Sequence, residues 1–202
     1  MLVLHDTCAI LMLLRIAPEM FKNPAYGCMT LIQVKNEYVR NPVFKSKYPW
    51  RGDFAHHISI TSEYQLRQKG FDKRRKQVSS LCQAVQNPRT GHAYDYDLSA
   101  VDKDIAAALV TIDAELCTGD TNLASFVEEQ LEIICHSPLA ILNRWIDEGL
   151  VVWSEAHQAV ITEWVSQEKT QPANEINRFE ELTAKKYPRF TKAPQSRSKP
   201  QK

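Results

Sequence analysis

Short apolar runs alternate with longer amphipathic stretches over most of the chain. The apolar runs are short enough to be buried strands, and they lie at residues 2–4, 28–29, 115–117 and 131–135. The stretches with apolar positions every three or four residues predict helices at residues 7–16, 30–40, 61–86, 99–111, 121–130 and 138–148. Strands that alternate with helices in this way predict an α/β fold with a parallel sheet covered by helices on both faces.

Capping residues and prolines set the expected helix boundaries. Thr30 with Gln33 fits a capping box that opens one helix, and Pro42 ends it. Ser99 with Asp102 is a variant of the same box. Gly70 should break the long basic helix, and residues 43–60 give weak signals that favour an irregular connection.

The pattern divides the chain into three parts. Residues 1–150 form the expected α/β domain, and residues 151–187 a helical extension with helices near 155–167 and 174–186. Residues 188–202 are rich in Pro, Ser and Gln, contain basic residues and no acid, and are expected to be a disordered tail. The segment 87–91, with its Asn-Pro and Thr-Gly pairs, is expected to be a loop.

Composition narrows the class of protein only modestly. With 202 residues, 44% hydrophobic residues and a net charge of +1, the chain has the composition of an ordinary globular protein. Its five cysteines are scattered without a Cys-x-x-Cys pair, which favours free thiols in a reducing cytoplasm. The apolar amino terminus lacks a basic region, and no apolar run approaches the ~20 residues of a membrane span. We therefore expect a cytoplasmic protein.

Four acidic residues stand out against this background. Asp6 and Asp120 follow two of the predicted strands, while Glu37 and Asp102 lie inside predicted helices beside apolar residues. Parallel sheets bind ligands at the carboxyl ends of their strands, so the fold should bring these carboxylates together. Hard cations such as Mg²⁺ or Mn²⁺ select clustered carboxylates. The four acids therefore predict a metal site.

Phosphodiester hydrolysis is the chemistry that this site favours. A bound divalent cation lowers the pKa of a water nucleophile and neutralises charge that develops at the phosphate. Thr7 and Thr118 are auxiliary candidates, because their hydroxyls can contact a metal-bound water or a neighbouring acid. Histidine and cysteine show no spacing typical of a zinc site or of thiol catalysis.

Each acid also has a purely structural interpretation. Asp6 can cap the first helix, Asp102 can belong to a capping box, and Asp120 beside Gly119 can be a turn residue. Glu37 can be an ordinary solvated helix residue. Asp104 is expected on the exposed side of its helix, away from the site. All these structural interpretations would have to hold together to remove the predicted site.

The residues around the acids resemble the PIN-domain family of nucleases. The resemblance rests on the strand that ends in Asp6-Thr7, on Val34-x-x-Glu37, on Asp102-x-x-Ile105-Ala106-Ala107 and on Thr118-x-Asp120, and it covers about residues 1–136. It implies a three-layer α/β/α fold whose acidic pocket binds one or two Mg²⁺ or Mn²⁺ ions and hydrolyses RNA. Stand-alone members similar to VapC-type toxins are held inactive by an antitoxin protein, which the resemblance implies as a partner here.

A basic stretch between the second and third acids is the candidate RNA track. Arg67, Lys73, Arg74 and Arg75 can neutralise phosphates, although an ordinary solvated helix face would look the same. Three alternatives stay open: a toxin ribonuclease, a nuclease acting on DNA or in RNA maturation without an antitoxin, and a catalytically silent RNA-binding protein. The sequence also leaves a homodimer open.

Overall fold

The chain folds around a four-stranded, all-parallel sheet with the strand order β2-β1-β3-β4 in this computed structural model, which describes residues 2–84, 96–165 and 171–189. The strands are β1 (Val3–His5), β2 (Cys28–Met29), β3 (Glu115–Cys117) and β4 (Cys135–His136). The predicted α/β class with a parallel sheet is confirmed. The predicted loop at residues 87–91 and nearly all of the predicted tail lie outside the described residues.

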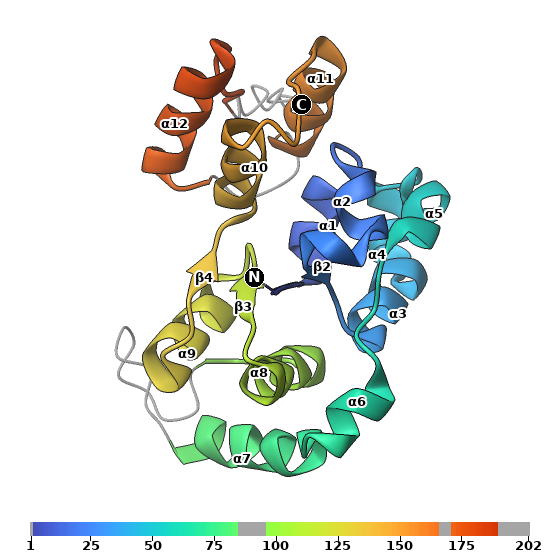
Figure 1. The fold of residues 1–202 in the computed structure, drawn as a ribbon, viewed down its shortest axis with the longest axis vertical. Coiled ribbons are helices and arrows are strands. Elements are labelled where there is room, and N and C mark those ends of the chain that lie inside the picture. Colours follow the sequence, from blue (N-terminus) through green and yellow to red (C-terminus); the bar gives the residue numbers. More distant parts are fainter. Residues whose placement is uncertain (1, 85–95, 166–170, 190–202) are drawn as a thin grey trace, which may run out of the picture.

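Helices surround this small sheet (Figure 1). Before β3 the helices are α1 (Thr7–Leu13), α2 (Pro18–Lys22), η1 (Pro24–Tyr26), α3 (Ile32–Arg40), α4 (Pro42–Lys47), α5 (Arg51–Phe54), η2 (Ala55–His57), α6 (Glu63–Gln68), α7 (Phe71–Ala84) and α8 (Ala100–Ile112). After β3 they are α9 (Thr121–Leu131), α10 (Pro138–Asp147), α11 (Glu155–Val165) and α12 (Ala173–Thr183). Figure 1 shows α7, α8 and α9 below the sheet, α1 to α5 to its right, and α10 to α12 above it.

Helix α8 packs in the centre of the fold because its middle is built from small side chains. Ala106, Ala107 and Ala108 are fully buried, so the backbone of α8 can approach its neighbours closely. Its amino terminus carries the predicted capping box, in which Asp102 N donates to Ser99 Oγ at 3.1 Å and Ser99 N donates to Asp102 Oδ2 at 2.8 Å.

Several predicted boundaries and elements are wrong. Thr30 does not cap α3, because its hydroxyl donates to the His5 carbonyl at 2.6 Å; Leu31 is the N-cap residue and provides no side-chain bond. Residues 43–60 are largely helical rather than irregular: Asn41 caps α4, whose first residue is Pro42. The predicted strand at 131–135 is mostly absent, since α9 runs to Leu131 and β4 has two residues.

The two helices predicted after residue 150 are present, and they pack against the α/β body. Trp164 of α11 stacks on Tyr48 with ring centroids 6.1 Å apart, and Arg15 of the body pairs with Glu163 at 2.5 Å. Asn143 of α10 donates to the Glu175 carbonyl of α12 at 2.8 Å. Among the described residues, no helix is long and apolar enough to cross a membrane.

This packing predicts that the extension unfolds together with the body. Replacing the buried Trp164 with Ala removes its stack on Tyr48 and should lower the free energy of unfolding by about 3–5 kcal/mol, within a single transition. Urea denaturation followed by fluorescence and circular dichroism measures both properties. Val152→Ala, at a position 82% exposed, is the control and should change little. A Trp164→Ala transition that splits in two would contradict a single cooperative unit.

Candidate active site at the carboxyl edge of the sheet

The pairing of β1 with β3 places the ends of these two strands side by side. Leu4 lies opposite Leu116 and His5 opposite Cys117, and the next residue, Asp6, donates its backbone N–H to the Cys117 carbonyl at 3.1 Å. From β1 the sheet continues to β2 on one side, and from β3 to β4 on the other. The carboxyl edge at such a reversal is where open parallel sheets bind ligands.

Asp6 is the most buried of the four predicted acids. Its exposed fraction is 6%, and it caps α1 by accepting the Ala9 N–H on Oδ1 at 2.6 Å. The second oxygen, Oδ2, accepts a short hydrogen bond from the Thr118 hydroxyl. The buried carboxyl group thus has a protein donor on each oxygen, which offsets part of the cost of removing it from water.

Thr118 connects Asp6 to Asp120. Besides donating to Asp6, its hydroxyl oxygen accepts the Asp120 N–H at 2.9 Å. Asp120 caps α9 with Oδ1, which accepts from Asn122 N at 2.7 Å and Leu123 N at 3.1 Å. Within the described part of the chain, Asp120 Oδ2 has no hydrogen-bond donor, so one oxygen of this acid is available to a ligand.

Glu37 on α3 and Asp102 on α8 lie beside the same cavity as Asp6 and Asp120. Thr7, the residue after Asp6, donates a short hydrogen bond to Glu37 Oε2 on α3. Asp102 uses Oδ2 in the capping box of α8. All four carboxylates line one cavity of about 220 Å³, to which Cys8, Phe44 and Ser99 also contribute.

Burial and like charge together change the ionisation of Asp6. Burial is the main cause that raises its pKa, the charges of Asp102 and Asp120 raise it as well, and the hydrogen bonds from Thr118 and Ala9 lower it; together these effects move the pKa from 3.8 to about 7. The charges of two other acids therefore act on Asp6. Mutual repulsion of this kind is what a bound cation relieves.

The four carboxylates are suitable ligands for a hard divalent cation, but their side chains lie too far apart to coordinate one ion together. Over residues 2–84, 96–165 and 171–189, no group of three His, Cys, Asp or Glu side chains is close enough to hold a metal ion. Carboxylate oxygens are nevertheless the ligands that Mg²⁺ and Mn²⁺ prefer. Binding would require the four side chains to draw together within their shared cavity.

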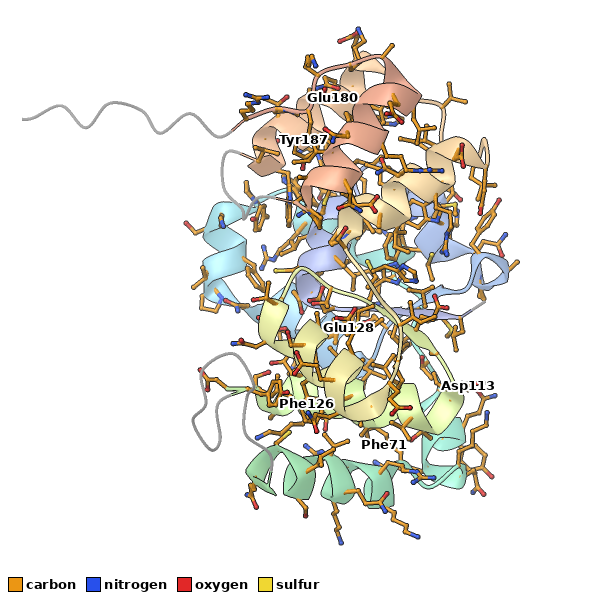
Figure 2. All side chains as sticks on the ribbon, turned by 90° about the vertical axis from the view of Figure 1, so that its left-hand side faces the viewer. Phe71, Asp113, Phe126, Glu128, Glu180 and Tyr187 are labelled. Carbon is orange, nitrogen blue, oxygen red and sulfur yellow. The ribbon has the colours of Figure 1, made fainter. Side chains whose placement is uncertain are left out.

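The predicted basic residues lie on α6 and α7, and they differ in availability. Arg67, Lys73 and Arg74 are exposed, and the outer side chains of α7 point away from the molecule (Figure 2). Arg75, in contrast, forms a short ion pair with Asp104 on α8. The expectation that Asp104 is exposed is therefore wrong: it is 4% exposed, because α7 covers this side of α8 and provides the compensating cation.

A second and larger cavity adjoins the acidic one and was not predicted. Its volume is about 410 Å³, and it shares Asp120 with the acidic cavity. Glu128, His136 and Gln171 line it from α9, β4 and the segment before α12. One face of α9 contributes Thr121, Ala124 and Glu128, and their helical spacing can be recognised in the sequence. Nothing in the sequence indicates that this face lies beside Gln171.

Comparison of the chain with protein-family models, curated proteins and solved structures gave no match. The class of the protein therefore rests on its fold and on the geometry of this site.

The raised pKa of Asp6 predicts how stability depends on pH in metal-free buffer. Between its ordinary value of 3.8 and about 7, the folded protein keeps a proton that the unfolded chain has lost. Asp6 therefore contributes a fall in the free energy of unfolding of about 1.4 kcal/mol for each pH unit through this window, whereas buried His5, whose pKa is lowered to about 4, contributes a rise of similar size up to its ordinary value of 6.5. Asp6→Asn, which cannot ionise, should remove the contribution of Asp6, so the free energy of unfolding of the variant relative to that of the wild type should rise by about 1.4 kcal/mol per pH unit through the window.

Urea denaturation across the window measures the effect. Asp113→Asn is the control, because Asp113 is an exposed residue at the end of α8 and lies outside the cavity. An Asp6→Asn variant with the pH profile of the wild type would show that Asp6 ionises normally in the folded protein.

Proposed function

We propose that the protein is a metal-dependent phosphodiesterase that cleaves RNA, with Asp6, Glu37, Asp102 and Asp120 as its metal ligands. The observation that carries the proposal is the convergence of these four carboxylates on one cavity at the carboxyl edge of the sheet. Helix capping explains why an acid stands at a helix end, where one of its oxygens is used. It does not explain why four acids from four segments of the chain surround one cavity.

In this proposal, each side chain is already oriented by a neighbour. The Thr118 hydroxyl donates to the Asp6 carboxylate, the Asn122 and Leu123 N–H groups donate to that of Asp120, and the Thr7 hydroxyl donates to that of Glu37. A bound Mg²⁺ or Mn²⁺ would supply charge neutralisation at the phosphate and a water of lowered pKa. The chain's own contribution is to fix the positions of the carboxylates and to keep the Asp6 side of the cavity away from bulk water.

A PIN-type fold remains part of the proposal. The parallel sheet and the order of the acids along the chain support it. The three-layer arrangement, an antitoxin partner and a homodimer stay predictions from the sequence. We favour RNA over DNA because of the family resemblance, and cleavage assays with both nucleic acids separate the two.

Asp120→Asn should abolish cleavage without loss of the fold. Asn retains an oxygen that can cap α9, but it removes a charge that the metal needs. Purified wild type and variant are incubated with defined RNA and DNA in Mg²⁺, Mn²⁺ or EDTA, and Mg²⁺-dependent rises in melting temperature are recorded in parallel. The wild type should cleave RNA, lose activity in EDTA and be stabilised by the metal.

Asp113→Asn serves again as the matched control and should behave as the wild type. Cleavage of DNA alone would reassign the substrate. Full activity of Asp120→Asn, or wild-type protein that neither cleaves nor is stabilised by either metal, would refute the proposed metal site.

The exposed cations of α7 should contribute to RNA affinity through counterion release. We expect the variant Lys73→Ala/Arg74→Ala/Lys76→Ala to reduce the slope of log affinity against log salt by up to about 2, at roughly 0.7 per lost contact with single-stranded RNA. Turnover at saturating RNA should change little, because α7 does not line the acidic cavity.

Arg75 is left intact in this variant, since its loss would leave Asp104 buried without a counter-charge. Fluorescence anisotropy at several salt concentrations gives the slope. An unchanged slope would mean that the outer face of α7 does not contact the RNA.

A further inference from the structure

The larger cavity has three walls that come from separate parts of the chain. Thr121, Ala124 and Glu128 form the wall from α9, and residues 135–138 form the wall from β4 and the start of α10. Gln171 and Pro172 close the third side from the helical extension. A volume of about 410 Å³ lies within the usual range for small-molecule sites, which is about 300–1,000 Å³.

Its position fixes what part of a nucleic acid could reach it. Asp120 lines both cavities, so a ligand whose phosphate lies among the four acids would place the next covalent unit in the larger cavity. In a polynucleotide that unit is a ribose with its base. If the acidic cavity holds the scissile phosphate, as in the proposed function, the larger cavity faces the nucleoside beside it.

The charges of the residues that line the larger cavity disfavour a phosphate group there, in addition to the one in the acidic cavity. Glu128 is exposed, and no ion pair or hydrogen bond engages its carboxylate within the described ranges. His136, the one ionisable nitrogen base among the lining residues, already contacts Glu115 through Nε2 at 2.6 Å. With Asp120 and Glu128 as its carboxylates, the cavity suits an uncharged group rich in N–H donors.

Shape and hydrogen-bonding groups complete the match to a base. Ala124, Pro138 and Pro172 offer apolar surface for the faces of a flat ring. Gln171 is 9% exposed, and its Oε1 accepts the Leu139 N–H at 3.4 Å, which leaves its NH₂ group as a donor. A carboxylate accepts two adjacent N–H groups and the amide donates to a carbonyl, and guanine presents this combination of groups on one edge.

We propose that the larger cavity binds the nucleoside adjacent to the cleaved phosphate and prefers guanosine, with Glu128 reading the two N–H groups of the base. This inference rests on the proposed function for its biological meaning, because the acidic cavity must hold the phosphate. Nucleoside binding itself requires neither metal nor turnover.

The first test measures nucleosides alone in metal-free buffer, by saturation-transfer NMR titration of guanosine, adenosine, cytidine and uridine. Guanosine should bind at least about tenfold more tightly than uridine, because a good bidentate contact discriminates bases by about that factor or more. Glu128→Gln should remove most of this preference, since an amide offers one acceptor and one donor. Ala124→Phe, which fills the cavity, should lower the affinity for all four nucleosides.

Glu181→Gln is the matched control, because Glu181 is an exposed acid on α12 that does not line the cavity. Equal affinity for the four nucleosides, or guanosine binding unchanged by Ala124→Phe, would overturn the proposal.

The second test separates this proposal from the proposed function. Cleavage of short RNAs that differ only in the position of one guanine, in Mg²⁺, should occur next to guanine in the wild type and lose this bias in Glu128→Gln. Cleavage without a base preference would overturn the nucleoside site while the nuclease stands. If the protein binds guanosine selectively but cleaves no RNA, the proposed nuclease function is refuted and the nucleoside site stands.

Discussion

The parallel pairing of β1 with β3 is the constraint on which the rest of the site depends. Because both strands run in the same direction and in register, Asp6 and Thr118 emerge at one edge, close enough for a direct hydrogen bond. That bond makes the burial of Asp6 tolerable, and it positions Asp120 through the same hydroxyl. An antiparallel pairing of these strands would have sent the two segments to opposite edges and left Asp6 buried without a donor on Oδ2.

Helix capping does not compete with the proposed metal binding by the same residues. Asp6 and Asp120 cap helices, and Asp102 completes a capping box, so each structural interpretation of these acids is also true. A carboxylate has two oxygens, and a cap needs one of them. Anchoring one oxygen to a helix end fixes the direction of the other, which is a simple way to preorganise several carboxylates around a cavity before any ligand arrives.

The parts that could be predicted from the sequence were those set by local rules. Apolar runs located β1 and β3, and strand ends located Asp6 and Asp120. Two signals were read incompletely or wrongly: Pro42 ends α3 as predicted but also starts α4, and the Thr30 hydroxyl bonds to His5 of β1 rather than to α3. Asp104 and the larger cavity required tertiary information, because Arg75 and Gln171 reach their neighbours from distant segments.

The wall formed by Gln171 and Pro172 has a thermodynamic consequence, because Pro172 is also the N-cap residue of α12. Any local opening of α12 would remove one side of the cavity, so an occupant of the cavity makes that opening rarer. The coupling is reciprocal: a partner that binds α12 and stabilises its closed position would increase the affinity of the cavity for its occupant by the same free energy. The helical extension thus offers a route by which an event on the outer surface can adjust affinity beside the four acids.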